Sequence, residues 1–113
     1  MSECRLNAYH IMWIFVFFDL PVVTKIERKV ATLFRKNLMK DGFTMLQYSV
    51  YIRHCSSYES MNVHKRRVKS FVPDKGMVSI LSVTDKQYSD IMNFWGIEKK
   101  KKTFSNPLQL EFF

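Results

Sequence analysis

An unbroken apolar run near the start of the chain limits its possible folds more than any other feature. Residues 12–18 (M-W-I-F-V-F-F) are all apolar, and Asp19 ends the run. Leu20 and Pro21 follow, and proline lacks the N–H that a central strand needs. Such a run is typical of a central β-strand that is covered on both faces, or nearly so. It is too short to cross a bilayer, so we expect no membrane association.

Two capping boxes mark the starts of two helices. Thr24 with Glu27 predicts a first helix at about residues 24–41, ended by Gly42 as a left-handed cap. Ser56 with Glu59 predicts the start of a second helix. The positions expected to be buried have helical spacing: Ile26, Val30, Leu33, Phe34 and Leu38 in the first helix, and Met61, His64, Val68 and Phe71 in the second.

The remaining order of elements predicts the fold class. Residues 44–53 are too long for one simple strand and predict two short strands with a tight connection near Ser49. Residues 77–83 predict another strand after a turn at 73–76, and residues 84–92 predict a short helix, with a short strand expected at 93–97. The order β-α-β-β-α-β predicts an α+β, ferredoxin-like sandwich in which two helices cover one face of a four-stranded sheet.

The chain of 113 residues is expected to be one domain over 1–113. Residues 1–11 are a lead-in, and residues 98–113 are expected to form a basic loop and a C-terminal strand. In that strand Leu108, Leu110 and Phe112 alternate with their neighbours. The two cysteines, Cys4 and Cys55, match neither zinc spacing nor a disulfide framework, which indicates a reducing, cytoplasmic location.

The formal net charge of +8 favours a polyanionic partner. Nucleic acid is the first candidate, because basic surfaces bind phosphates by releasing counterions; anionic membranes and acidic proteins are the alternatives. The first helix bears most of the cations expected to contact phosphate: Lys25, Arg28, Lys29, Arg35 and Lys36. A merely solvated helix face is the alternative interpretation. Four more cations follow in the second helix: Lys65, Arg66, Arg67 and Lys69.

Asp19 is the residue that most suggests chemistry. A carboxylate at a strand end, beside a basic helix, could bind a hard divalent cation through oxygen. The alternative is a turn residue that accepts hydrogen bonds from nearby backbone amides. A single aspartate is a poor metal site, and a two-fold axis would be needed to supply a second one.

Three segments together resemble one family. Residues 12–21 are similar to the family's opening strand, an apolar run closed by aspartate. Residues 42–51 resemble its G-x-x-x-x-Q-x-S-V-[FY] segment, and residues 78–88 resemble its closing strand and the segment after it. The family is the small CRISPR-associated endoribonuclease of the adaptation module, the second of its two near-universal proteins, in the form found with type II systems.

The resemblance implies a homodimer of ferredoxin-like subunits that bridges integrase dimers and binds spacer duplex DNA during spacer acquisition. It implies that Asp19 of each subunit faces its twin, as a catalytic and metal-binding residue. Two such carboxylates repel unless a cation lies between them, and Mg²⁺ suits that position. The implied reaction is metal-dependent phosphodiester hydrolysis of RNA or DNA. Leu108, Leu110 and Phe112 would bind a partner, the twin subunit or the integrase, by strand addition.

Two alternatives remain at this point. A toxin-type ferredoxin-like ribonuclease, acting alone on cellular RNA, would have the same apolar first strand and basic helices. A small-ligand regulatory domain of the same fold would normally be acidic or neutral and have glycines in its ligand loop, and these features are missing here.

Overall fold

The computed structural model describes residues 11–96, which form a four-stranded antiparallel sheet in the order β2-β3-β1-β4 with two long helices and one short helix. The elements are β1 (Met12–Asp19), α2 (Lys25–Lys40), β2 (Thr44–Gln47), β3 (Val50–Cys55), α3 (Tyr58–Ser70), β4 (Met77–Thr84) and α4 (Asp85–Ser89). The predicted α+β, ferredoxin-like arrangement is confirmed. Most of the lead-in, the basic loop and the predicted C-terminal strand lie outside the described residues.

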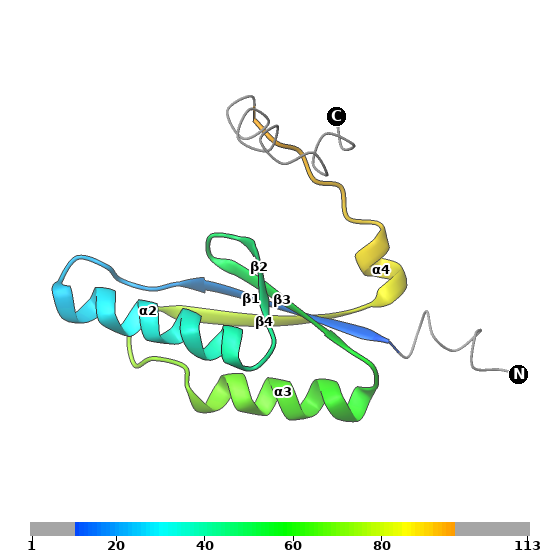
Figure 1. Cartoon of the computed structure of the whole chain (residues 1–113), viewed down its shortest axis with the longest axis horizontal. Coiled ribbons are helices and arrows are strands. Elements are labelled where there is room, and N and C mark those ends of the chain that lie inside the picture. Colours follow the sequence, from blue (N-terminus) through cyan, green and yellow to red (C-terminus); the bar gives the residue numbers. More distant parts are fainter. Residues whose placement is uncertain (1–10, 97–113) are drawn as a thin grey trace, which may run out of the picture.

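The apolar run forms β1, which lies in the interior of the sheet between β3 and β4. Because side chains alternate along a strand, Met12, Ile14, Val16 and Phe18 all point to one face, where each is at most 6% exposed. These side chains pack with Phe34 and Leu38 of α2 and Val68 of α3. Figure 1 shows both long helices on this side of the strands, below the sheet.

The turn chemistry near the ends of α2 agrees with the sequence. Thr24 caps the helix, with its hydroxyl accepting from the Glu27 N–H at 3.1 Å while the Glu27 carboxylate accepts from the Thr24 N–H at 3.0 Å. Gly42 has φ of +91°, the left-handed conformation predicted for the helix end. The two predicted short strands are β2 and β3, joined by a turn at Tyr48 and Ser49.

The prediction of the buried face of α2 was wrong for three residues. Ile26, Val30 and Leu33 are 75%, 41% and 56% exposed, whereas Ala31 is buried beside the correctly predicted Phe34 and Leu38. The helix therefore contacts the sheet through a narrower stripe than its apolar residues occupy. The apolar residues of α2 cover more of the helix surface than the sheet can bury, and only tertiary packing determines which of them face the sheet.

Four smaller differences concern the ends of elements, one missing strand and the cover of β1. The N-cap of α3 is Ser57, which accepts from the Ser60 N–H at 3.1 Å, so the predicted box of Ser56 and Glu59 is wrong by one residue. The helix after β4 ends at Ser89, and residues 93–96 form no strand. The cover of β1 on the face away from the long helices is partial, since Phe15 is 6% exposed and Phe17 is 38% exposed. Within residues 11–96, no helix has the length and apolar character needed to cross a membrane.

Candidate functional site

Asp19 is the last residue of β1 and is exposed. It lies opposite Met77, the first residue of β4. On the other side of β1, the Phe18 N–H donates to the Ser49 carbonyl at 3.1 Å, which brings the β2–β3 turn close to the same strand end. Gly76 approaches so closely that a Cβ there would lie 2.6 Å from the Asp19 carbonyl oxygen. Asp19 is thus held between two turns by its backbone.

The carboxylate of Asp19 belongs to the sheet face that the long helices leave uncovered. By strand alternation this outer face also receives Phe15 and Phe17 from β1. On the neighbouring β4, Met77 pairs with Asp19 and Leu81 pairs with Phe15, and they are 69% and 49% exposed. Among residues 11–96, neither long helix covers the apolar side chains beside Asp19, and an exposed apolar patch of this kind is typical of an interaction surface.

The end of the outer face away from Asp19 is closed by an aromatic cluster. The Trp13 ring stacks on Tyr88 with ring centroids 3.8 Å apart, and its indole N–H donates to a carboxylate oxygen of Asp85 at 2.7 Å. The His54 ring meets Trp13 edge-on with centroids 5.1 Å apart. This packing attaches α4 to the sheet, and from there residues 90–96 lead away from the body (Figure 1).

One subunit does not by itself supply a metal site in the part of the chain that the structure describes. No group of three or more His, Cys, Asp or Glu side chains there is arranged to hold a metal ion. The Asp19 carboxylate forms no hydrogen bond or ion pair with another described residue. Its donor set therefore fits a divalent cation only if a second carboxylate comes from another subunit.

The structure divides the five predicted phosphate-binding cations into two groups. Lys25, Lys29 and Lys36 are spaced four and seven residues apart, so they lie on one exposed face of α2. A shallow groove of about 340 Å³ follows this face, lined by Lys25, Arg28, Lys29, Thr32, Leu33 and Lys36. These three lysines form no ion pair with a described residue and are available to an anion.

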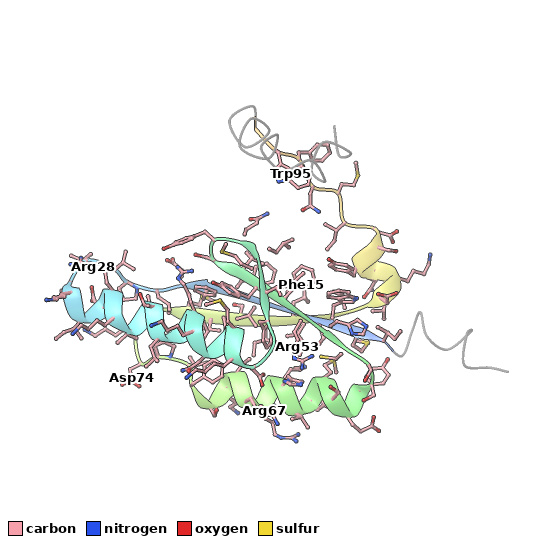
Figure 2. The ribbon with its side chains drawn as sticks, in the orientation of Figure 1. Phe15, Arg28, Arg53, Arg67, Asp74 and Trp95 are labelled. Carbon is pink, nitrogen blue, oxygen red and sulfur yellow. The ribbon has the colours of Figure 1, made fainter. Side chains whose placement is uncertain are left out.

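The two arginines of the predicted set make local contacts instead. Arg28 donates from Nη1 to the carbonyl oxygens of Val22 and Val23, at 3.2 and 2.8 Å (Figure 2). Arg35 donates to the Tyr48 carbonyl at 2.6 Å, and its guanidinium lies 3.9 Å from the centre of the Tyr48 ring. Arg28 thus braces the start of α2, and Arg35 holds the β2–β3 turn against the helix.

A partly buried polar cluster around Asp41 was not predicted from the sequence. The Asp41 carboxylate, 9% exposed at the end of α2, contacts His64 Nδ1 at 2.8 Å and Arg67 Nη1 at 3.0 Å, both on α3. Arg53 of β3 donates to the Asp41 carbonyl at 2.8 Å (Figure 2). His64 is therefore a satisfied core histidine. The cluster joins residues far apart in the chain, and no local motif reveals it.

Two other features considered in the sequence analysis are Cys55 and the C-terminal strand. Cys55 is buried, and burial raises the pKa of its thiol, which disfavours the reactive thiolate. The predicted partner-binding residues Leu108, Leu110 and Phe112 lie outside the described residues and stay predictions.

Comparison with known proteins connects this geometry to a family. The sequence model described as "CRISPR associated protein Cas2" matches residues 12–91, which include β1, Asp19 and both long helices. The chain is 46% identical over 109 residues to the CRISPR-associated endoribonuclease Cas2 of Flavobacterium psychrophilum, covering 96% of this chain and 94% of that protein. It is also 46% identical over 102 residues to the CRISPR-associated endoribonuclease Cas2 of Parvibaculum lavamentivorans, covering 90% and 100%.

Proposed function

Because the chain belongs to the CRISPR-associated Cas2 family, we propose that it acts in spacer acquisition, as a homodimer that bridges integrase dimers and holds duplex DNA. The position of Asp19 supports this most directly: it is a free carboxylate on the uncovered apolar face of the sheet. We also propose a metal-dependent phosphodiesterase activity for the same dimer. The printed names of its relatives, CRISPR-associated endoribonuclease, support that part.

The homodimer is supported by the chemistry of the outer sheet face. Phe17, Leu81 and Met77 are too large and too apolar to favour exposure as one group, and burying them against a twin would remove their surface from water. A two-fold contact uses the same patch on both subunits. Asp19 lies on this patch, so the same contact would bring two Asp19 carboxylates toward the axis.

Mg²⁺ is the cation proposed to lie between these two carboxylates. It accepts a few carboxylate ligands and keeps several waters, which suits a site with one donor from each subunit. When bound, it would lower the pKa of a bound water and stabilise the charge that develops on a phosphodiester. The role of the protein would be to position Asp19 at the end of β1, where the Phe18 N–H donates to the Ser49 carbonyl and the backbone of Gly76 passes close to the Asp19 carbonyl.

Duplex DNA is proposed to contact the exposed lysine face of α2. Lys25, Lys29 and Lys36 would neutralise phosphates without reading bases, which suits a protein that must hold spacers of any sequence. RNA presents the same phosphate chemistry and is a second possible ligand of this surface. Leu108, Leu110 and Phe112 are proposed to add as a strand to an edge of the twin's or the integrase's sheet. β2 and β4 are the edges of the described sheet, each with one paired neighbour.

A reconstituted integration assay with the cognate integrase tests the proposal. We expect the wild-type protein to stimulate spacer integration over integrase alone, in a reaction that weakens as salt is raised. Asp19→Asn retains the shape of the side chain and removes its charge, so it separates a metal role from a structural one. Asp74→Asn, at an exposed position in the turn before β4, is the matched control.

The outcomes are distinct. If wild type and Asp19→Asn stimulate integration equally, the bridging role stands and the metal site is not needed for it. If only wild type stimulates, the Asp19 charge is required within the complex. Absence of any stimulation by wild type would contradict the acquisition role, and growth arrest on expression without a partner would then favour a ribonuclease acting alone.

A further inference from the structure

The α2 lysines are not the only free cations on the helical side of the molecule. A groove of about 410 Å³ runs between α3 and the edge strand β4. It is lined by Asn62, Lys65, Arg66, Lys69, Val72, Val78 and Ile80. Three of its lining residues are cationic and none is acidic.

The two flanks of α3 are used differently. On one flank, His64 and Arg67 contact Asp41 at the end of α2. On the other flank, Lys65 Nζ lies 3.4 Å from the Ser82 hydroxyl of β4, which places its charge over the groove. Arg66 and Lys69 are exposed and form no hydrogen bond or ion pair with another described residue. Arg66 and Lys69 are thus not needed to hold the described fold together.

We infer that the α3–β4 groove is a second binding surface for the phosphate backbone of a nucleic acid, distinct from the lysine face of α2. The inference rests on the proposed DNA-binding function and extends its footprint. Arg66 offers a planar fork that matches phosphate oxygens, and Lys65 and Lys69 are flexible point charges one helical turn apart. The apolar floor, which includes Val78 and Ile80, would contact sugar carbons.

The charge of this groove argues for phosphate over a protein segment. A neighbouring groove of about 430 Å³ is lined by Ile26, Val30, Glu27, Asp74 and Lys75 among others, so its rim has both signs of charge. The α3–β4 groove has only positive charge. Lysine is depleted from protein–protein interfaces, whereas Lys and Arg are the main phosphate contacts in nucleic-acid complexes.

The test is the salt dependence of duplex binding, measured by fluorescence anisotropy between low and moderate salt. The variant Arg66→Gln/Lys69→Gln removes two free charges from the groove and keeps the hydrogen bond between Lys65 and Ser82. Lys75→Gln/Lys86→Gln removes two exposed charges from the turn before β4 and from α4, and so has the same net charge. Circular dichroism confirms that both variants are folded.

In the groove variant, each subunit that touches the duplex loses two phosphate contacts. We expect each lost contact to reduce the magnitude of the slope of log K against log salt by about one, which is about two for each subunit. The control variant should bind like wild type. Equal slopes for the two variants, with wild type still strongly salt-dependent, would overturn the groove and leave the proposed function intact. If duplex binding by the wild-type protein does not change with salt concentration, the result instead contradicts the proposed function. The groove variant is also tested for co-purification with the integrase. If it binds DNA like wild type but no longer co-purifies with the integrase, the groove contacts a protein and the inference is overturned.

Discussion

At the scale of single residues, Asp41 links three elements of the fold through its carboxylate and its carbonyl group. Its buried carboxylate is the shared partner of His64 and Arg67, and its carbonyl accepts from Arg53. One residue thus ties the end of α2 to α3 and to β3. When a buried hydrogen-bonding group is removed, most of the loss in folding free energy comes from the remaining polar groups that no longer have a hydrogen-bond partner.

Asp41→Ala should lower the free energy of unfolding by about 2 kcal/mol, because it leaves the buried His64 ring without its hydrogen-bond partner. Urea denaturation followed by circular dichroism measures the change. Asp74→Ala is the matched control, since Asp74 is exposed in a turn, and it should change stability by no more than about 0.5 kcal/mol. Similar small losses in both variants would contradict the role given to Asp41.

Glu27 provides a pH-dependent test at the start of α2. Hydrogen bonds from the backbone N–H groups of Thr24 and Val23 hold the pKa of Glu27 below its ordinary value of 4.5. A depressed folded pKa contributes stability above the ordinary value, and this is lost as pH falls through the folded pKa. The wild type should therefore exceed Glu27→Gln in stability at pH 7, and the gap should shrink at acidic pH. Thermal unfolding at both pH values checks this, and a constant gap would disagree with it.

At the scale of elements, the turn between α3 and β4 sets the position of Asp19. Gly76 has φ of +91°, and a Cβ there would meet the Asp19 carbonyl oxygen at 2.6 Å and Leu20 Cα at 3.0 Å. Both obstacles are backbone atoms, so relief requires movement of the strand end that presents Asp19. The glycine is thus needed for both conformation and space.

Gly76→Ala should destabilise the protein by more than about 1 kcal/mol, since the left-handed conformation and the close contact both penalise a side chain. Gly96→Ala is the matched control, because its added Cβ meets nothing within 4 Å. Thermal unfolding of the two variants gives the comparison. A Gly76→Ala protein as stable as Gly96→Ala would mean that the turn can relax away from Asp19.

At the scale of the whole molecule, the two sides of the sheet have different tasks. One side holds the core beneath α2 and α3, and the other exposes apolar side chains next to Asp19. Neither long helix covers the outer side, and the proposed function has this side form the contact between two subunits.

Leu81→Glu should convert the proposed dimer into monomers. A carboxylate on the outer face of β4, opposite Phe15 of β1, would be buried without a partner on association. This costs well over the roughly 1.4 kcal/mol that weakens a dimer tenfold. Val23→Glu is the control, at an 84% exposed position just before α2. Sedimentation velocity distinguishes the two species. A Leu81→Glu protein that remains dimeric would place the interface elsewhere.

Local chemistry allowed much of the fold to be predicted from the sequence. The apolar run ended by Asp19, the Thr24–Glu27 capping box and the glycine at position 42 are all properties of near neighbours in the chain, and the structure contains each of them. The element order then leaves few ways to pack two helices on one sheet. The position of Asp19 at the end of β1 was also predictable, because a carboxylate that follows an apolar run contrasts with its neighbours.

Tertiary packing alone decided the rest. Ile26, Val30 and Leu33 have helical spacing, yet only contact with the sheet determines which apolar stripe of α2 is buried. The link from Asp41 to His64 and Arg67 spans 23 and 26 residues, beyond the reach of any local pattern. Most of the strands and helices could be predicted from the sequence, since capping, turns and periodicity act over a few residues, but the strand expected at 93–97 is absent from residues 93–96. Which cations are free and which face is uncovered depend on distant residues meeting in space.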